Sequence, residues 1–185
     1  MQAAGEIVFD SQDYLVWEEL QEQKHEFIKG EVFAMGGARR EHVVVSLNIA
    51  TILKQHLRGT PCQAYIADMK LRVEQEDAFY YPDVMVSCDN NDQKAEQYLS
   101  NPVLIVEVLS DSTEAYDRGA KFAAYRQLPS LKEYVLVDID ARRLECFRRA
   151  ENNDWLLHIT DGKEECDFLS LGLSVAMDDV FEDVG

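Results

Sequence analysis

An almost continuous run of apolar, mostly β-branched residues extends from Pro102 to Leu109 and is interrupted by one carboxylate, Glu107. Such a run, with Asn101 before it and a polar, serine-rich turn after it, predicts a strand that is buried on both faces. Burying an ionised carboxylate is costly unless a cation, a metal or strong hydrogen-bond donors compensate its charge. Glu107 is therefore a candidate functional residue. The alternative is that it pairs with a lysine or an arginine in the core.

The spacing of apolar and polar positions predicts short helices and strands on both sides of this run. Helical spacing indicates amphipathic helices, strict alternation indicates half-buried strands, and Gly, Pro and Asn mark the turns. Before Pro102 the predicted elements are a helix capped by Asp10 or Ser11 that ends near Gln23, a hairpin from Glu26 to Met35, a helix from Arg39 to Arg58 with His42 in its first turn, and paired strands from Tyr65 to Val73 and from Phe79 to Val86. After Leu109 they are a helix from Ser112 or Thr113 to about Leu128, a buried strand from Tyr134 to Ile139, and a hairpin of the segments 144–147 and 155–159.

The order strand, helix, strand between Pro102 and Ile139 predicts a parallel, right-handed crossover. Combined with the hairpins, this crossover predicts an α/β fold with a mixed central β-sheet flanked by helices. The chain has 185 residues, of which 46% are hydrophobic, so it is long enough to bury a substantial core. We expect a single domain that spans residues 1–185.

Neither a membrane segment nor a redox framework is predicted. Residues Met1 to Gly5 do not form a basic start followed by an apolar core, and no stretch approaches the roughly 20 apolar residues that span a bilayer. The four cysteines are far apart and include no Cys-x-x-Cys pair, so neither a zinc ribbon nor a disulfide framework is indicated. A reducing cytoplasm is the expected compartment.

The net charge of −17 counts against binding to nucleic acid and favours a metal, a cationic partner or simple solubility. Net charge is nevertheless a coarse measure, because nuclease sites concentrate carboxylates and a local basic rim can operate on an acidic protein. The basic residues form three clusters, namely Arg39-Arg40, Arg118 with Lys121 and Arg126, and Arg142-Arg143 with Arg148-Arg149. The first two can flank a phosphate backbone, whereas the third is typical of the solvated face of a hairpin.

A second carboxylate, Asp83, follows Pro82 and precedes Glu107 by 24 positions. Two carboxylates that converge from neighbouring strands, completed by a backbone carbonyl and water, form an oxygen-rich site suited to Mg²⁺ or Mn²⁺. Such a metal can activate water and stabilise the charge that develops on a phosphoryl group during hydrolysis. The alternative for Asp83 is an ordinary turn after Pro82.

Several motifs, taken together and in order, resemble a bacterial family described as restriction endonucleases, within the PD-(D/E)xK nuclease superfamily. The residues that carry the resemblance are Glu26-Phe27-Ile28-Lys29-Gly30-Glu31, His42, Tyr81-Pro82-Asp83-Val84, the segment from Val106 to Thr113, Lys121 with Tyr125, and the segment from Glu133 to Asp138. No single piece is specific, but the ordered set is, and it extends from about Tyr14 to Phe181. The resemblance implies a restriction-endonuclease-like fold whose core covers these residues.

The resemblance also implies an activity, which is Mg²⁺-dependent (or Mn²⁺-dependent) hydrolysis of DNA phosphodiester bonds by an endonuclease. Asp83 and Glu107 would hold the metal together with the Val108 carbonyl, and Glu31 and His42 would assist. For the last two residues the alternatives are a surface glutamate and a helix-end histidine. A homodimer is compatible with cutting two strands, although no interface can be identified from the sequence.

This chain departs from the superfamily pattern at one position. The lysine of the motif is expected two residues after Glu107, where this sequence has Leu109. In the resembling family an equivalent lysine lies on the following helix, and Lys121 is the matching residue, since a long side chain two turns into that helix can reach the carboxyl end of the strand. The alternative is a solvated Lys121 that pairs with Asp117 four positions earlier.

A second function class is compatible with these features, namely a catalytically silent protein that keeps the fold as a binding or assembly module. The acidic composition and the missing strand lysine favour it. The triplet Asp68-Met69-Lys70 mimics the motif but precedes Pro82-Asp83, so its order is wrong. Asp68 could still approach the metal across the strand pair.

Overall fold

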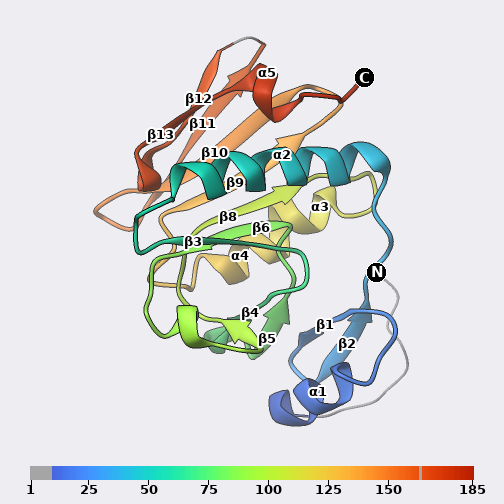
Figure 1. Cartoon of the computed structure of the whole chain (residues 1–185). Coiled ribbons are helices and arrows are strands. Elements are labelled where there is room, and N and C mark those ends of the chain that lie inside the picture. The colour runs from blue at the N-terminus through green and yellow to red at the C-terminus, as the bar shows by residue number, and fades with distance from the viewer. Residues whose placement is uncertain (1–9, 163) are drawn as a thin grey trace.

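The computed structural model describes residues 10–162 and 164–185 (Figure 1), so the Met1–Gly5 segment considered above lies outside the described residues. The helices are α1 (Ser11–Glu18), α2 (Arg40–His56), α3 (Glu114–Tyr116), α4 (Phe122–Tyr125) and α5 (Met177–Val180), with a π-helical turn η3 (Asp117–Lys121) and 3-10 turns η1 (Glu74–Glu76), η2 (Asp92–Lys94) and η4 (Leu169–Leu171). The strands are β1 (His25–Ile28), β2 (Glu31–Ala34), β3 (Gln63–Ile66), β4 (Lys70–Val73), β5 (Ala78–Tyr80), β6 (Val84–Ser87), β7 (Tyr98–Leu99), β8 (Pro102–Val108), β9 (Glu133–Asp138), β10 (Arg143–Arg149), β11 (Trp155–Asp161), β12 (Glu165–Phe168) and β13 (Leu173–Ala176).

The strands form two mixed sheets and a small hairpin. The six-stranded sheet has the order β11-β10-β9-β8-β6-β3, with β8 and β9 parallel and the other pairs antiparallel. The five-stranded sheet has the order β2-β1-β5-β4-β7, and β12 pairs with β13. In Figure 1 the N-terminal elements α1, β1 and β2 lie at one end of the molecule, and the C-terminal strands lie at the other. The mixed α/β fold expected from the sequence is confirmed.

The alternating side chains of β8 enter two different cores. Leu104, Val106 and Val108 pack with α2 and with the β12–β13 hairpin, in a cluster we call the α2-side core. Ile105, together with Leu109 directly after the strand, packs with residues from α4 and β9, in a cluster we call the α4-side core. Both faces of β8 are therefore covered, which confirms the prediction of a strand buried on both faces. This burial explains why its sequence is almost continuously apolar.

Two strands predicted as single elements are each divided between the sheets. The alternating segment from Tyr65 to Val73 forms β3 and β4, which belong to different sheets and are separated by a turn at residues 67–69. Its partner is interrupted at residues 81–83 between β5 and β6, where Pro82 cannot supply a ladder hydrogen bond. The chain therefore crosses from one sheet to the other directly at Pro82-Asp83.

The remaining predicted elements agree with the structure, with shifted ends. Helix α1 is capped by the side chain of Asp10, as expected, but it ends at Glu18 rather than near Gln23. Helix α2 and the β1–β2 hairpin match their predictions, and the hairpin turn has positive φ at Lys29 and Gly30. None of the helices in residues 10–162 and 164–185 is long and apolar enough to cross a membrane.

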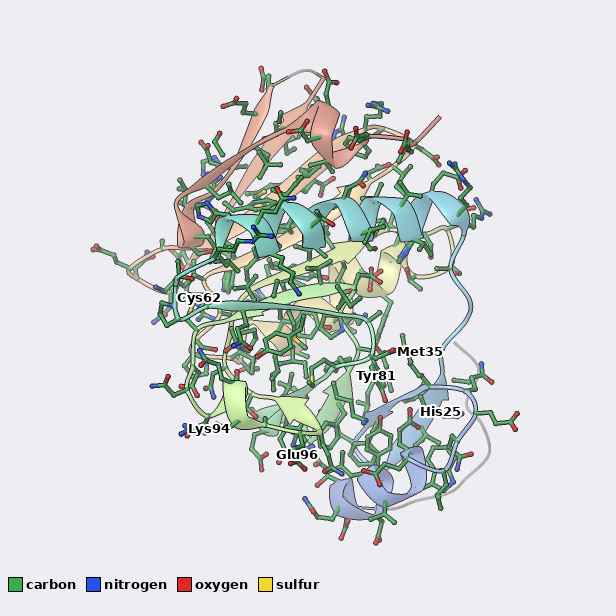
Figure 2. All side chains as sticks on the ribbon, in the orientation of Figure 1. His25, Met35, Cys62, Tyr81, Lys94 and Glu96 are labelled. Carbon is green, nitrogen blue, oxygen red and sulfur yellow. A yellow bond between two sulfur atoms is a disulfide. The ribbon has the colours of Figure 1, made fainter. Side chains whose placement is uncertain are left out.

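The cysteines differ from the expectation that no disulfide is present. Cys62 and Cys88 are joined, because the β3–β6 register that pairs Gln63 with Ser87 brings the two residues just beyond these strands side by side. Figure 2 shows Cys62 on the segment that enters β3. Cys146 and Cys166 are free and buried, with their sulfur atoms 3.3 Å apart.

Candidate active site

The two carboxylates singled out in the sequence lie opposite each other where the sheets meet. The antiparallel register pairs Val84 with Val106, so Asp83, one residue before β6, lies across from Glu107. Ile105 belongs to the α4-side core, and alternation along β8 places Glu107 on that same face, where it contacts Lys121. Asp83 lies in the bend before β6 and is opposite Glu107 in register, so the two residues are neighbours across the strand pair. That their carboxyl groups share a metal ion stays a prediction.

Asp83 is held in place by a backbone donor and by a histidine from another element. Its Oδ2 atom accepts a hydrogen bond of 2.8 Å from the Val108 amide and lies 3.2 Å from Nε2 of His42. His42 lies in the first turn of α2, so this helix end contacts the end of β8 across the sheet edge. His42, proposed from the sequence as an assisting residue, therefore lies beside Asp83; its role stays a prediction.

The charge on Asp83 changes the protonation of His42. Burial on its own lowers the pKa of His42, but hydrogen bonds to Asp83 and to the Val108 backbone, together with the charge of Asp83, outweigh burial and raise the pKa above 6.5. A raised pKa in the folded state means that the native protein binds this proton more tightly than the unfolded chain does. The protonated His42 thus contributes stability that is fully present below about pH 6.5.

We predict that the metal-free protein loses this contribution as the pH rises through the folded-state pKa of His42. Replacing His42 with Gln should destabilise the protein most in mildly acidic solution and least at about pH 9. Urea unfolding of both proteins in the presence of a chelator measures the difference at each pH. A destabilisation that is the same at every pH would contradict the ion pair with Asp83.

Lys121 enters the site from a widened helical turn. The predicted helix after β8 forms as three consecutive segments, α3, η3 and α4, and η3 is a π-helical turn that contains both Asp117 and Lys121. Single π-turns occur frequently at functional sites, where they redirect side chains. No sequence pattern indicates this π-helical turn. The prediction that Lys121 lies on the helical connection after β8 agrees with the structure.

The ammonium group of Lys121 is surrounded by carboxylates. Its Nζ atom lies 2.9 Å from Glu107 Oε1, 3.3 Å from Glu26 Oε1 and 3.5 Å from Asp117 Oδ1. Lys121 is only 6% exposed, which excludes the alternative of a solvated lysine, although the pairing with Asp117 that this alternative assumed is present. Tyr125 donates a hydrogen bond of 2.8 Å to the same Glu107 oxygen.

The hairpin contributes Glu26 to this cluster rather than Glu31. Glu26 is 2% exposed and faces Lys121, whereas Glu31 begins β2, is exposed, and lies opposite Ile28 beside the turn. The assignment of Glu31 to the site is therefore corrected. The position of each glutamate in the hairpin could have indicated this difference. Glu26 pairs with Phe33 in the body of the strands, whereas Glu31 directly follows the Lys29-Gly30 turn.

Burial and the repulsion of neighbouring carboxylates raise the pKa values of Glu107 and Asp117. Burial raises the pKa of Glu107 well above 4.5, and the charges of Asp83 and Asp117 add to the shift, while Lys121 opposes it. Burial likewise raises the pKa of Asp117. For Lys121, burial lowers the pKa, but the nearby Glu107, Glu26 and Asp117 outweigh burial and raise it well above 10.5. The lysine is therefore charged at neutral pH.

A second buried network attaches the N-terminal hairpin to the Pro82-Asp83 segment. Tyr81 donates a hydrogen bond of 2.9 Å to Glu18, whose carboxylate also accepts the His25 amide at 2.8 Å. Tyr14 donates to the His25 carbonyl at 2.6 Å. Figure 2 shows His25 and Tyr81 close together where the hairpin meets the rest of the molecule. These contacts position β1, and hence Glu26, against the site.

The donor set fits a divalent metal in its chemistry and its charge. Glu26, Asp83, Glu107 and Asp117 supply four carboxylates against the cations Lys121 and His42. The Oε1 atom of Glu26 is buried and its partner is the Lys121 ammonium at 3.3 Å, without a hydrogen bond of its own. Within residues 10–162 and 164–185 no three acidic, histidine or cysteine side chains are grouped closely enough to enclose an ion by themselves. A metal here therefore needs backbone and water ligands as well, as the sequence hypothesis assumed.

Several of the basic residues form ion pairs or hydrogen bonds within the fold. Arg148 pairs with Glu133, and Arg149 donates to three backbone carbonyls at the end of the crossover helix. Arg118 pairs with Glu114 and Glu145, and Lys24 pairs with the exposed Asp68. Asp68 is therefore turned to solvent rather than to the carboxylate pair.

Comparison with known proteins shows the family of this chain. Residues 11–178 match the family model described as "Uma2: Putative restriction endonuclease". This chain belongs to the Uma2 family. The resemblance found in the sequence is thereby confirmed, and the motif residues from Glu26 to Asp138 all lie within the matched part of this Uma2 protein.

Two proteins of Synechocystis are similar to this Uma2 protein over most of their length. The uncharacterized protein slr1290 is 38% identical over 170 residues, which cover 92% of this chain and 90% of the relative. The uncharacterized protein sll1609 is 33% identical over 162 residues, which cover 85% and 90%. A crystal structure from Anabaena variabilis, described as a "putative nuclease belonging to DUF820", aligns with a TM-score of 0.72 at 15% identity and covers 87% of this chain and 91% of its own. At that identity the likeness shows the fold.

Proposed function

We propose that this Uma2 protein is a Mg²⁺-dependent endonuclease that hydrolyses DNA phosphodiester bonds. The observation that carries the proposal is the position of Asp83 opposite Glu107 in the β6–β8 register, with the ammonium of Lys121 2.9 Å from Glu107. The family description supports the reaction class. The excess of carboxylates over cations supports a divalent cofactor, either Mg²⁺ or Mn²⁺.

In this proposal Asp83, Glu107 and the Val108 carbonyl hold the metal. A bound Mg²⁺ or Mn²⁺ supplies a Lewis acid and lowers the pKa of water at the site. Glu26, which pairs with Lys121, adds a carboxylate to the same oxygen-rich environment, and the Val108 amide keeps Asp83 oriented through their hydrogen bond. The carboxylates also exclude other anions until a cation is present.

Lys121 and His42 act on the scissile phosphate and on protons. The Lys121 ammonium offsets negative charge on the phosphate and orients the attacking water, which is the role of the lysine absent at Leu109. His42 carries its proton beside Asp83 and donates a hydrogen bond to a phosphate oxygen or to the leaving group. Lys121 comes from η3 and His42 from α2, so the two cations belong to helical elements on either side of β8.

A metal titration combined with a cleavage assay tests the proposal. The protein should bind Mg²⁺ or Mn²⁺ in calorimetry and should convert supercoiled plasmid DNA to nicked or linear forms only when one of these metals is present. RNA of the same sequence, incubated in parallel, tests the preference for DNA. Absence of both metal binding and cleavage would reject the proposal and favour the catalytically silent binding or assembly module. In such a module Lys121 would serve only to neutralise the buried charge of Glu107.

The corrected hairpin residue provides a matched pair of variants. We predict that Glu26→Gln lowers the cleavage rate by about ten-fold to a hundred-fold, because an oxygen beside Lys121 loses its charge. Glu31→Gln should leave the rate unchanged, since Glu31 is exposed beside the hairpin turn. Steady-state cleavage rates of the two variants measure the contrast. Equal effects of both substitutions would reject the placement of Glu26 in the site.

A further inference from the structure

Strand β11 is a long, unprotected edge of the six-stranded sheet. It pairs with β10 on one side, and within residues 10–162 and 164–185 no strand pairs with its other side. It is seven residues long, whereas the other edge strands of the two sheets, β2, β3 and β7, have four, four and two residues. Figure 1 shows β11 beside β10, at the end of the molecule opposite α1, β1 and β2. A long free edge presents N–H and C=O groups that another strand can bind.

The side chains of β11 do not discourage such pairing. Edge strands are usually protected by lysine, proline or inward-pointing charges, and β11, with the sequence Trp-Leu-Leu-His-Ile-Thr-Asp, contains neither lysine nor proline. Leu156, Leu157 and Ile159 are 55%, 47% and 53% exposed. The chain has a net charge of −17, yet Asp161 is the only carboxylate on this strand. Two copies can therefore approach along β11 without bringing many acidic groups together.

We propose that β11 pairs antiparallel with β11 of a second copy of this chain and joins two six-stranded sheets across a two-fold axis. In a symmetric antiparallel pair one residue lies opposite itself, and its neighbours pair in reverse order. With His158 on the axis, Leu157 lies opposite the partner's Ile159, and this apolar pair occurs twice. Moving the axis to Ile159 would place Leu157 opposite the partner's Asp161 instead. Moving it to Leu157 would keep apolar pairs but leave Asp161 beyond the end of the partner's strand, opposite the partner's Asn153. The apolar pattern and the position of Asp161 together therefore favour His158.

The ends of the paired strands are complementary in charge in this register. Asp161 lies opposite the partner's Trp155, and in each copy the guanidinium of Arg149 lies 4.6 Å from the centroid of the Trp155 ring. The carboxylate of one copy therefore meets a stacked arginine of the other. The two-fold axis repeats this contact, so each end of the strand pair has one Asp161 beside one Arg149 and Trp155.

The proposed contact surface continues the α4-side core. The register places Leu157 beside Phe147, and the Phe122 ring packs against Phe147 at 4.6 Å and against Trp155 at 5.4 Å between centroids. Leu157 and Ile159 of both copies would therefore close over an aromatic cluster that already packs on β9 through Tyr134. This inference is independent of the metal and of the proposed cleavage reaction.

Sedimentation velocity of the full chain over a range of concentrations tests the interface. We expect a monomer–dimer equilibrium whose dissociation constant rises about ten-fold or more in Leu157→Lys and in Ile159→Lys, because each places charge in the apolar pair. Leu169→Lys is the matched control, since Leu169 is 61% exposed on η4, outside β11. Far-UV circular dichroism verifies that each variant is folded. A monomer at all concentrations, or a dimer that neither β11 variant weakens, would overturn the proposal.

Cysteine cross-linking tests the register separately. A mixture of Leu157→Cys and Ile159→Cys proteins should form a cross-linked dimer with a short thiol-reactive reagent, because these positions lie opposite each other across the axis. Either variant alone should cross-link much less, since each then faces a non-cysteine residue. Efficient cross-linking of Leu157→Cys alone would place the axis at another residue and overturn the proposed register.

Discussion

Glu107→Gln is expected to abolish both metal binding and DNA cleavage while leaving the fold intact, and Asp83→Asn should do the same. The cleavage rate should fall by about a thousand-fold or more, because a metal-stabilised transition state is favoured by several kcal/mol and each factor of ten corresponds to about 1.4 kcal/mol. Gln preserves the shape of Glu107 and can still accept the hydrogen bond from Tyr125. Asn can still accept the hydrogen bond from the Val108 amide. Plasmid cleavage and calorimetric titration with Mn²⁺ measure the two losses.

Glu114→Gln is the matched control for these variants. Glu114 is an exposed carboxylate on α3, and its partner Arg118 retains a second carboxylate, Glu145, so stability should change by no more than about 0.5 kcal/mol. Wild-type cleavage by Glu114→Gln would show that a general loss of negative charge does not inactivate the protein. Undiminished cleavage by either Asp83→Asn or Glu107→Gln would reject the proposed metal site.

The parts of the site that depend on strong local patterns could be predicted from the sequence. The apolar run around Glu107 identifies a strand covered on both faces, and the strand-helix-strand order places Lys121 over that strand. Pro82 signals the interruption that brings Asp83 to the junction of the sheets. In each case the physical constraint acts within one element or between adjacent elements, so a single sequence contains it.

Features that depend on register between distant segments could not be predicted in the same way. Apolar and polar residues alternate without a break through residues 67–69. This two-residue period therefore does not reveal that β3 and β4 belong to different sheets. The Cys62–Cys88 disulfide joins residues 26 positions apart and requires the β3–β6 register. Glu26 and Glu31 belong to one hairpin, and only the position of each glutamate relative to its turn determines which of them faces Lys121.

The network of Glu18, His25 and Tyr81 illustrates a further limit. Glu18 and His25 stand in no recognisable motif, yet together with Tyr81 they connect α1, β1 and the segment before Pro82 through buried hydrogen bonds. Their function is positional, because they hold Glu26 and Asp83 on facing elements. Sequence spacing identifies the residues that carry charge into a site more readily than the residues that hold those elements together.

Lys121→Met is expected to have the largest effect on stability, because it removes the one cation in contact with three buried carboxylates. Glu26, Glu107 and Asp117 would remain with no ammonium at 2.9 to 3.5 Å, and breaking a buried ion pair from one side costs about 3–5 kcal/mol. Urea unfolding in the presence of a chelator measures this loss at neutral pH. Lys132→Met is the control, since Lys132 is exposed in the same connection and its replacement should cost no more than about 0.5 kcal/mol.

The pH and metal dependence of Lys121→Met distinguish an electrostatic cause from lost packing. The pKa values of Glu107 and Asp117 are already raised by burial, and without Lys121 these groups take up protons still more readily in the folded state. The destabilisation should therefore be largest at neutral pH and should shrink as the pH falls through the folded-state pKa values of these carboxyl groups. Mg²⁺ or Mn²⁺ should restore part of the stability at neutral pH without restoring cleavage, because a divalent cation replaces the missing charge but not the ammonium beside the phosphate. A loss that is independent of both pH and metal would mean that Lys121 acts through packing alone.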